Sequence, residues 1–342
     1  MSGGITGGEA PLPGEAPEVP ALIPALVCAA LCVALNHIPY GGIFFLTPLG
    51  LAAFAWGRKT AWIAGLLALA GGVLAAFVFR GDWTGLLYFT LAAGLFVWII
   101  APPAPAMLPG VPGRIVLASG LWAAALGGIL LGGGEESPLR LLFRAQGEFI
   151  SSLYTTAQGA DVVEREMMQR YLSPDAAAGL IMGVTLRGGA LVSCVLLFVF
   201  NLEGAALVNF FIRRVRPSLN LADFHAPRWL IWVLSLSLAG IVLSRGLGIA
   251  AADIAAWNVL AACAVLYLAQ GIGIIGFFLA RRVLAPGLRM GIHILIIVMV
   301  FSPGINVVLL GAVVVLGIAE NWAPLRVSPD RDRPSSTPGN GD

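Results

Sequence analysis

Charged residues are scarce in this chain of 342 residues. Asp, Glu, Lys and Arg together make up 11% of it, whereas hydrophobic residues make up 58%. Soluble domains carry about a quarter charged residues, and so few polar side chains could not cover a globule of this size. The mean hydropathy is +0.90. The scarcity of charge excludes an ordinary soluble protein and predicts an integral membrane protein.

Histidine and cysteine are also rare. The three His residues, at 37, 225 and 293, are far apart, and the four Cys residues, at 28, 32, 194 and 263, all lie inside apolar runs. This spacing fits neither a disulfide framework nor a zinc site. Cys28 and Cys32 share one helix face and could hold a soft metal, but small residues in membrane helices more often serve close packing. We expect no metal and no cofactor, and the net charge of +2 does not favour a nucleic-acid partner.

Catalytic motifs are missing too. The chain contains no Walker phosphate loop, no HExxH and no GxSxG, which are the short patterns that carry phosphate binding, zinc hydrolysis and serine nucleophiles. We therefore expect a protein that is not an enzyme and does not hydrolyse ATP by the phosphate-loop route.

Long apolar runs, in contrast, fill the chain. A helix needs about twenty apolar residues to cross a bilayer, and breaks at Pro, Gly and charge leave ten candidate helices. They lie near 20–38, 41–57, 60–79, 83–101, 114–132, 178–212, 227–246, 253–280, 285–301 and 303–320. The second, ninth and tenth are short. The pattern predicts an all-α polytopic bundle of eight to ten membrane helices, with ten favoured.

The basic residues orient this bundle, because cytoplasmic loops collect Lys and Arg. With both termini in the cytoplasm, 13 of the 20 basic residues fall on the inner side. They are Arg58, Lys59, Arg114, Arg213, Arg214, Arg216, Arg228, Arg281, Arg282, Arg289, Arg326, Arg331 and Arg333. The distribution predicts a multi-pass membrane protein with both termini in the cytoplasm.

The polar stretches divide the chain into five parts. Residues 1–19 and 323–342 are rich in Gly, Pro and polar residues and are predicted to be disordered tails. Residues 133–177 are Glu-rich, with apolar residues at helical spacing, which predicts an amphipathic extracytoplasmic helical segment. It could lie on the membrane surface or cover an outward-facing cavity. Helix groups at 20–132 and 178–322 make up the remainder.

Polar residues at membrane depth are costly to bury and are the first places to look for a site. Glu203 and Gln270 lie well inside predicted spans, near the middle of the membrane. A second group lies at predicted outer helix ends: Asn36, His37, Asp82, Arg187, Arg245 and Asn306. Each has a structural alternative, such as a bond between helices for Gln270 or snorkelling for Arg187. Glu320, beside Trp322, is interpreted as a residue at the water line rather than as part of a site.

Small residues recur at four-residue spacing on several predicted helices. Two of these stripes are Ala21, Ala25 and Ala29, and Gly120, Ala124 and Gly128. Such stripes let helix backbones approach closely, either within one chain or against a partner. The sequence leaves both alternatives open.

Several segments carry a resemblance to a known family. They include IFFLTPLGLAAFAWGRKTAWIAG, YLSPDAAAGL, YLAQGIGIIGFFLARR and the closing GIAENWAPLR. In these the chain resembles the YybS-like bacterial membrane proteins, a family of unknown function. The family commonly ends in a Phe-Arg pair, where this chain has Leu325-Arg326. It is distantly similar to the substrate-binding subunits of energy-coupling-factor transporters and to the rod-shape protein MreD. That similarity implies that the Ala21, Ala25 and Ala29 stripe could meet a transmembrane coupling protein.

Two functional hypotheses follow. The first is a small-molecule transport or substrate-binding subunit, working in the bilayer with a coupling protein and its ATPases. The second is a non-catalytic scaffold for envelope-assembly proteins. An intramembrane lipid enzyme is a third and weaker alternative, because no nucleophile with a nearby base can be identified. The outer polar group and Glu203 favour the transport hypothesis.

Overall fold

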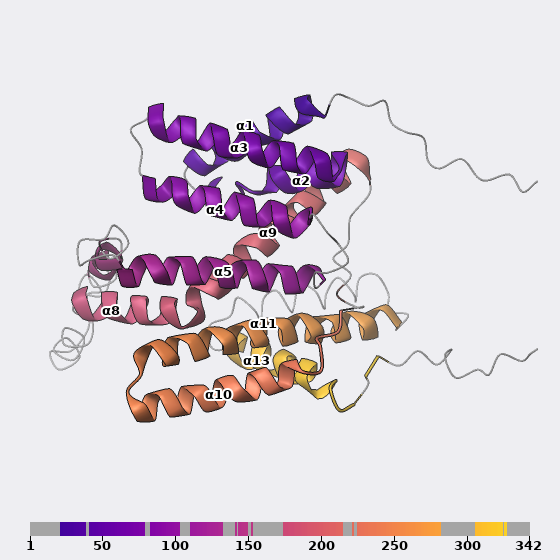
Figure 1. Cartoon of the computed structure of the whole chain (residues 1–342). Helices are drawn as coiled ribbons and strands as arrows, with labels where there is room; N and C mark the ends of the chain where they lie inside the picture. Colours follow the sequence, from indigo (N-terminus) through magenta and orange to yellow (C-terminus); the bar gives the residue numbers. More distant parts are fainter. Residues whose placement is uncertain are drawn as a thin grey trace, which may run out of the picture. The chain divides into compact units, whose positions relative to one another are not determined.

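The computed structural model describes residues 21–38, 41–78, 83–102, 110–132, 141, 143–149, 152, 174–214, 221, 224–281, 305–323 and 325–326. Every regular element in these ranges is helical. The chain forms two compact units (Figure 1). Unit 1 comprises Met1–Pro103 with Phe198–Pro217, and unit 2 comprises Ala104–Leu197 with Ser218–Asp342. The prediction of an all-α fold is confirmed.

Unit 1 is built around α3. Its elements are α1 (Leu22–His37), the short η1 (Gly41–Ile43), α2 (Thr47–Trp56), α3 (Arg58–Val78), α4 (Trp83–Ile100) and the second part of α9 (Ala190–Arg213). α3 packs against α1, α2 and α4. Ala25 and Ala29 on α1, and Ala64 and Ala68 on α3, are buried, because small side chains let these helices approach closely.

α2 is too short to cross a membrane by itself. Its ten residues span about 15 Å at 1.5 Å per residue, whereas the hydrocarbon core is about 30 Å thick. The irregular backbone before α2 is tied to α9, because Asn201 Nδ2 donates to the carbonyl of Ile43 at 2.8 Å. Thr47 Oγ1 donates to Asn201 Oδ1 at 3.0 Å. The predicted span 41–57 is therefore a turn followed by a half-length helix.

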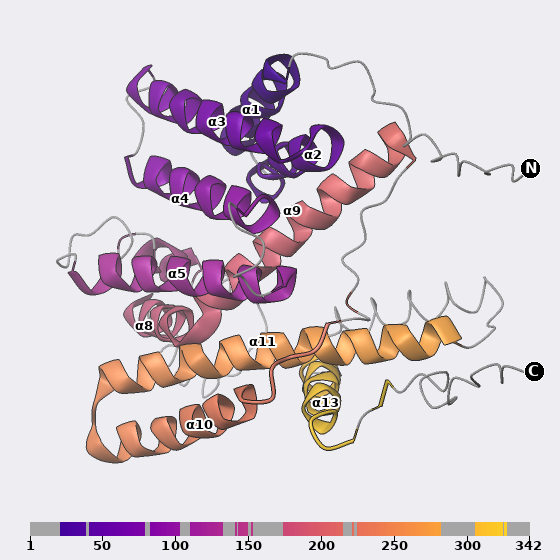
Figure 2. The ribbon, with the colours of Figure 1, turned by 45° about the vertical axis from the view of Figure 1, so that its right-hand side comes forward.

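Unit 2 is built around the long helix α11. Its elements are α5 (Val111–Gly132), α8 (Pro174–Val184), the π-turn η3 (Thr185–Gly189), the first part of α9, α10 (Leu230–Leu247), α11 (Ala250–Arg281) and α13 (Ile305–Ala319). α10 and α11 form an antiparallel hairpin, and α13 packs against α11 (Figure 2). η3 and α5 contact α11 as well.

Among the described residues, five helical stretches are long and apolar enough to cross a membrane. They are Arg58–Val78, Val111–Gly128, Asp175–Arg213, Leu230–Leu247 and Ala250–Leu279. Shorter apolar helices lie at Leu22–His37, Thr47–Trp56, Gly85–Ile100 and Val307–Ala319. The predicted span 178–212 lies within the stretch Asp175–Arg213, but its helix is interrupted at η3. The predicted span 285–301, the N-terminal tail, residues 327–342 of the C-terminal tail and most of the 133–177 segment lie outside the described residues, although residues 143–149 of that segment are helical. Arg326, in the predicted C-terminal tail, is instead buried and paired with Glu320.

Candidate functional site

The helix break at η3 requires glycine. Arg187 has φ −87° and ψ 38°, and Gly188 has φ +106°, a region that side-chain-bearing residues rarely adopt. A Cβ atom at Gly188 would also lie 2.9 Å from the Cβ of Ala261 on α11. Single π-turns inside helices are frequent at functional sites. The break directs attention to the residues around Arg187.

The turn between α10 and α11 brings two charged residues together. Gly248 ends α10 in the left-handed conformation, with φ +68°, and the Ile249 N–H donates to the carbonyl of Ser244 at 2.9 Å. This is the usual glycine stop of a helix, and α11 begins immediately afterwards. Arg245 in the last turn of α10 and Asp253 in the first turn of α11 therefore lie at the same end of the hairpin.

Arg187, Arg245 and Asp253 form what we call the arginine–aspartate cluster. Arg187 Nε donates to Asp253 Oδ2 at 2.7 Å, and Arg245 Nε donates to Asp253 Oδ1 at 3.3 Å. The side chain of Asp253 is 7% exposed, whereas those of Arg187 and Arg245 are 44% and 61% exposed. The cluster thus has a buried carboxylate below two accessible guanidinium groups.

Two neighbours on α11 hold the cluster in place. The guanidinium carbon of Arg245 lies 5.7 Å from the ring centroid of Trp257, within cation–π range. Asn258 Nδ2 donates to the carbonyl of Leu186 at 2.5 Å and to that of Ile254 at 2.9 Å. The first of these bonds satisfies a carbonyl at the helix break and fixes η3 to α11.

The charges of the cluster do not cancel. Two guanidinium groups and one carboxylate leave one net positive charge, and both arginines contact Asp253 through Nε. Within the described part of the chain, no further hydrogen bond is recorded for the terminal nitrogens of either arginine. Guanidinium groups bind carboxylates and phosphates with these nitrogens. The arrangement can therefore accept an anion from the exposed side.

A second set of charges, which we call the Glu320 clamp, is formed by Glu320, Arg326 and Gln270. Arg326 Nε donates to Glu320 Oε1 at 2.7 Å, and Arg326 Nη2 donates to Glu320 Oε2 at 2.5 Å. Gln270 Nε2 donates to Glu320 Oε2 at 2.8 Å. The side chains of Glu320 and Arg326 are 5% and 3% exposed. The sequence analysis interpreted Glu320 only as a residue at the water line, whereas the structure shows that its carboxylate is buried and paired.

The Glu320 clamp also binds the backbone that precedes α10. Arg326 Nη2 donates to the carbonyl of Phe224 at 2.8 Å, and the N–H of Ala226 donates to Gln270 Oε1 at 2.8 Å. These bonds join α11, the residues that follow α13 and the segment that precedes α10. The ion pair is charge-neutral and its polar atoms have partners, so the clamp is built for holding the fold rather than for binding a ligand.

Stability should depend on pH through Glu320. Burial raises the pKa of this carboxyl, but hydrogen bonds from Arg326 and Gln270 and the charge of Arg326 outweigh it, so the pKa is lowered below 4.5. A carboxyl whose pKa is lower in the folded state than in the unfolded state stabilises the fold at pH values above its unfolded pKa. That stabilisation is lost as the pH falls through the folded pKa. We expect the melting temperature of the detergent-solubilised protein to decrease when the pH is lowered below 4.5. The decline should be shallower in Glu320→Gln, and an identical pH profile in that variant would contradict the assignment.

The two charged sets lie towards opposite ends of one helix. Asp253 and Gln270 are both on α11, about 17 residues and thus about 26 Å apart. This separation is close to the thickness of the hydrocarbon core, about 30 Å. Gln270 binds Glu320 beyond the end of α13 and Ala226 before the start of α10. Gln270 therefore lies level with the end of α13 and the start of α10.

The other predicted site residues do not join these sets. Glu203 is half-buried on the part of α9 that belongs to unit 1. Asn36 is half-buried and His37 exposed at the end of α1, in the same unit. Asn306 lies on the first turn of α13, but its side chain is outside the described residues. Asp82 lies outside the described residues. Of the eight candidates, Arg187 and Arg245 belong to the arginine–aspartate cluster and Gln270 to the Glu320 clamp.

Sequence reasoning missed Asp253 and Arg326 as site residues, and it did not connect Arg245 with Asp253. A signal was available for this pair, because a glycine between two long apolar runs predicts a tight hairpin. Arg245 and Asp253 flank Gly248 closely in sequence. The contact with Arg187 joins residues 66 positions apart and has no local signal.

The two predicted small-residue stripes differ in their surroundings. Ala25 and Ala29 are buried and Ala21 is half-buried. On α5, Gly120 is half-buried, whereas Ala124 and Gly128 are exposed. A Cβ atom at Gly120 or Gly128 would meet nothing within 4 Å. The alanine stripe on α1 packs within unit 1. The glycines of the stripe on α5 have no close neighbour among the described residues.

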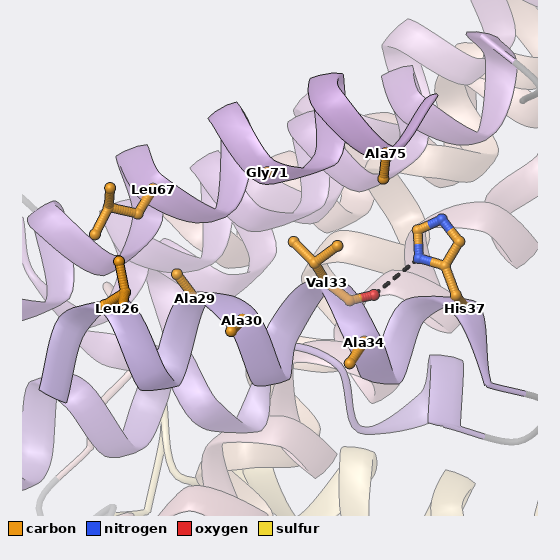
Figure 3. A pocket seen from close by; sticks show the side chains of 9 residues that line it. All are labelled: Leu26, Ala29, Ala30, Val33, Ala34, His37, Leu67, Gly71 and Ala75. Carbon is orange, nitrogen blue, oxygen red and sulfur yellow. Dashed lines mark hydrogen bonds between the residues drawn. The ribbon is translucent and has the colours of Figure 1, made fainter. Parts of the chain in front are cut away.

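An apolar groove of about 480 Å³ runs between α1 and α3 in unit 1 (Figure 3). It is lined by Leu26, Ala29, Ala30, Val33, Ala34, His37, Leu67, Gly71 and Ala75. His37 stands at one end, where its Nδ1 is hydrogen-bonded to the carbonyl of Val33 at 2.9 Å. Specific small-molecule sites combine apolar walls with several placed polar groups, and this groove has a single polar side chain.

The described residues contain no group of three or more His, Cys, Asp or Glu side chains able to hold a metal ion. Cys28, Cys32, Cys194 and Cys263 are buried and free. The chemistry that these residues offer is therefore that of the two charged sets.

Comparison with known proteins adds a family match. No curated protein and no solved structure matches the chain, so its relation to the YybS-like proteins, to energy-coupling-factor subunits and to MreD stays a prediction. A family described as "Predicted membrane protein (DUF2232)" does match. The matched residues include Arg245, Asp253 and Gln270, and the match supports a multi-pass helical membrane protein. Residues 189–319, from the end of η3 to the end of α13, are thus similar to a membrane protein family of unknown function.

Proposed function

We propose that this protein binds a small molecule for transport across the membrane, with the arginine–aspartate cluster as its binding site. The observation that supports this most directly is the broken helix at η3, which presents Arg187 beside Asp253. Discontinuous helices form the substrate sites of many transporters. Ionisable groups within membrane helices are costly and usually functional.

The accessibility of the two arginines separates this site from the Glu320 clamp. A purely structural ion pair is best buried and neutral, as Glu320 and Arg326 are. Arg187 and Arg245 are instead largely accessible above a buried carboxylate. This asymmetry fits a site that is completed by a ligand.

The topology belongs to the proposal as well. Ten spans with cytoplasmic termini in a bacterial inner membrane would place Arg187 and Arg245 on the outer side, where a substrate enters. The chain contains no phosphate-binding loop, so energy would come from a separate transmembrane coupling protein with ATPases. We propose no enzymatic activity.

The test is purification from the native membrane in mild detergent, with mass spectrometry of bound small molecules and proteins. We expect a stoichiometric small molecule that is lost from Arg187→Gln and retained by the control Arg58→Gln, whose exposed side chain starts α3 in the other unit. An empty protein that co-purifies with envelope-assembly proteins would overturn the proposal. It would favour the scaffold hypothesis, which the open glycine stripe on α5 supports.

A further inference from the structure

We propose that the arginine–aspartate cluster binds an oxyanion, a carboxylate or a phosphate group. This inference rests on the proposed function and names its substrate class. The cluster carries one net positive charge, which a single monoanion neutralises. A cation or an uncharged sugar would leave that charge uncompensated.

The hydrogen-bonding geometry supports the same class. Arg187 and Arg245 approach opposite oxygens of Asp253, Oδ2 and Oδ1, each through Nε. Their terminal nitrogens are donors in a planar fork that matches two oxygens of a carboxylate or phosphate. Both side chains are accessible, so a ligand can reach these donors without opening the fold.

One buried donor next to the cluster has no partner among the described residues. The Nε1–H group of Trp257 is buried and makes no hydrogen bond to the part of the chain that the structure describes, and it is a group that can donate to an anion. Trp257 contacts Arg245 through its ring. Unsatisfied buried polar atoms are rare in native proteins and often indicate a bound water, ion or ligand.

Asp253 acts as an internal counter-ion for the two arginines. Its buried carboxylate holds both arginines at the hairpin end, so that their donors are positioned before a ligand arrives. Removing its charge has two opposite consequences. The empty protein should become less stable, and the affinity for an anion should rise because the net charge of the cluster increases to two.

The test uses the full-length protein in detergent, with melting temperature as the readout. The probes are sodium acetate and inorganic phosphate, each compared with sodium chloride at equal ionic strength. Ligands that bind the folded state raise its melting temperature. We expect a half-saturating concentration about tenfold higher in Arg187→Gln and Arg245→Gln, lower in Asp253→Asn, and unchanged in Arg58→Gln.

Rescue of Asp253→Asn tests the same charge balance, because an anion bound by Arg187 and Arg245 would replace the negative charge that this variant lacks. We expect phosphate or acetate to restore much of the melting temperature that this variant loses. Equal responses of wild type, Arg187→Gln and Arg245→Gln to both probes, together with no rescue of Asp253→Asn, would overturn the inference.

The same oxyanion can come from a free metabolite or from a lipid headgroup. Nanodiscs of phosphatidylcholine alone are therefore compared with nanodiscs that contain phosphatidylglycerol. Stabilisation by the anionic lipid that depends on Arg187 and Arg245 assigns the site to a headgroup, and stabilisation by phosphate or acetate in the neutral nanodiscs assigns it to a soluble substrate. The absence of both effects contradicts the inference. If native purification still yields a small molecule that both arginine variants retain, transport stands with a different site.

Discussion

Replacing Arg326 by Ala is expected to lower the free energy of unfolding by about 3–5 kcal/mol, because it leaves the carboxylate of Glu320 buried without its partner. Arg326 supplies two hydrogen bonds to Glu320 and one to the carbonyl of Phe224. Both charged side chains are almost fully buried, so solvent would screen little of this loss. Melting of the detergent-solubilised protein would measure the effect.

A double-mutant cycle separates the interaction energy between Glu320 and Arg326 from the other effects of removing each side chain. Combining Glu320→Ala with Arg326→Ala should cost less than the sum of the two single changes, because the double variant leaves no uncompensated charge. Arg144→Ala is the control, since Arg144 forms an exposed ion pair with Asp175 at 3.7 Å. Exposed pairs contribute about 0–1 kcal/mol. Additive losses in the cycle, or an effect of Arg326→Ala no larger than that of Arg144→Ala, would contradict a role for the clamp.

The two charged sets lie at different positions along α11 and differ in charge balance and in exposure. Near Gln270 the charges are balanced and buried, which fixes α11, α13 and the segment before α10 together. Near Asp253 they are unbalanced and accessible, beside a helix break. Discontinuous helices form the substrate sites of many transporters. Under the proposed function, the arginine–aspartate cluster is therefore the binding part, and the Glu320 clamp is the part that holds the helices together.

Composition and apolar runs were sufficient to predict the helical membrane fold, because burial in lipid demands both apolar side chains and satisfied backbone hydrogen bonds. The break at η3 could not be predicted in the same way. Residues 178–212 read as one apolar stretch, and the tight approach of Gly188 to Ala261 is a tertiary contact without a periodic signal. The helix that looked continuous contains the feature that best supports a function.

The sequence predicted the helices better than it predicted which carboxylates are buried. Glu203 stood out because it interrupts an apolar run, and Glu320 did not because Trp322 and Arg326 follow it. Sequence distance from a helix end is a poor guide to burial when the chain folds back over that end. Arg326 returns to Glu320 and reaches the carbonyl of Phe224, 102 positions earlier in the chain. Only the fold reveals that contact, and with it the burial of the carboxylate.

The second large loss of stability is expected from Gly271→Ala, at the position where α11 packs against α13. A Cβ atom at this position would lie 2.1 Å from the carbonyl oxygen of Val313, and one at Gly317 on α13 would lie 2.1 Å from that of Tyr267. Backbone atoms cannot give way as a flexible side chain can. Gly271→Ala should therefore force the two helices apart and lower the free energy of unfolding by about 1–3 kcal/mol or more.

Gly276 provides the matched control on the same helix. A Cβ atom there would meet no other described residue within 4 Å, and alanine is a better helix former than glycine, so Gly276→Ala should not lower the melting temperature. Gln270 precedes Gly271 directly, and separating α11 from α13 would also pull its amide away from Glu320. Gly271→Ala should consequently weaken the pH dependence that Glu320 confers, which a loss of packing alone would leave intact. Equal melting temperatures for the two glycine variants would show that the contact between α11 and α13 is looser than the backbone distances require.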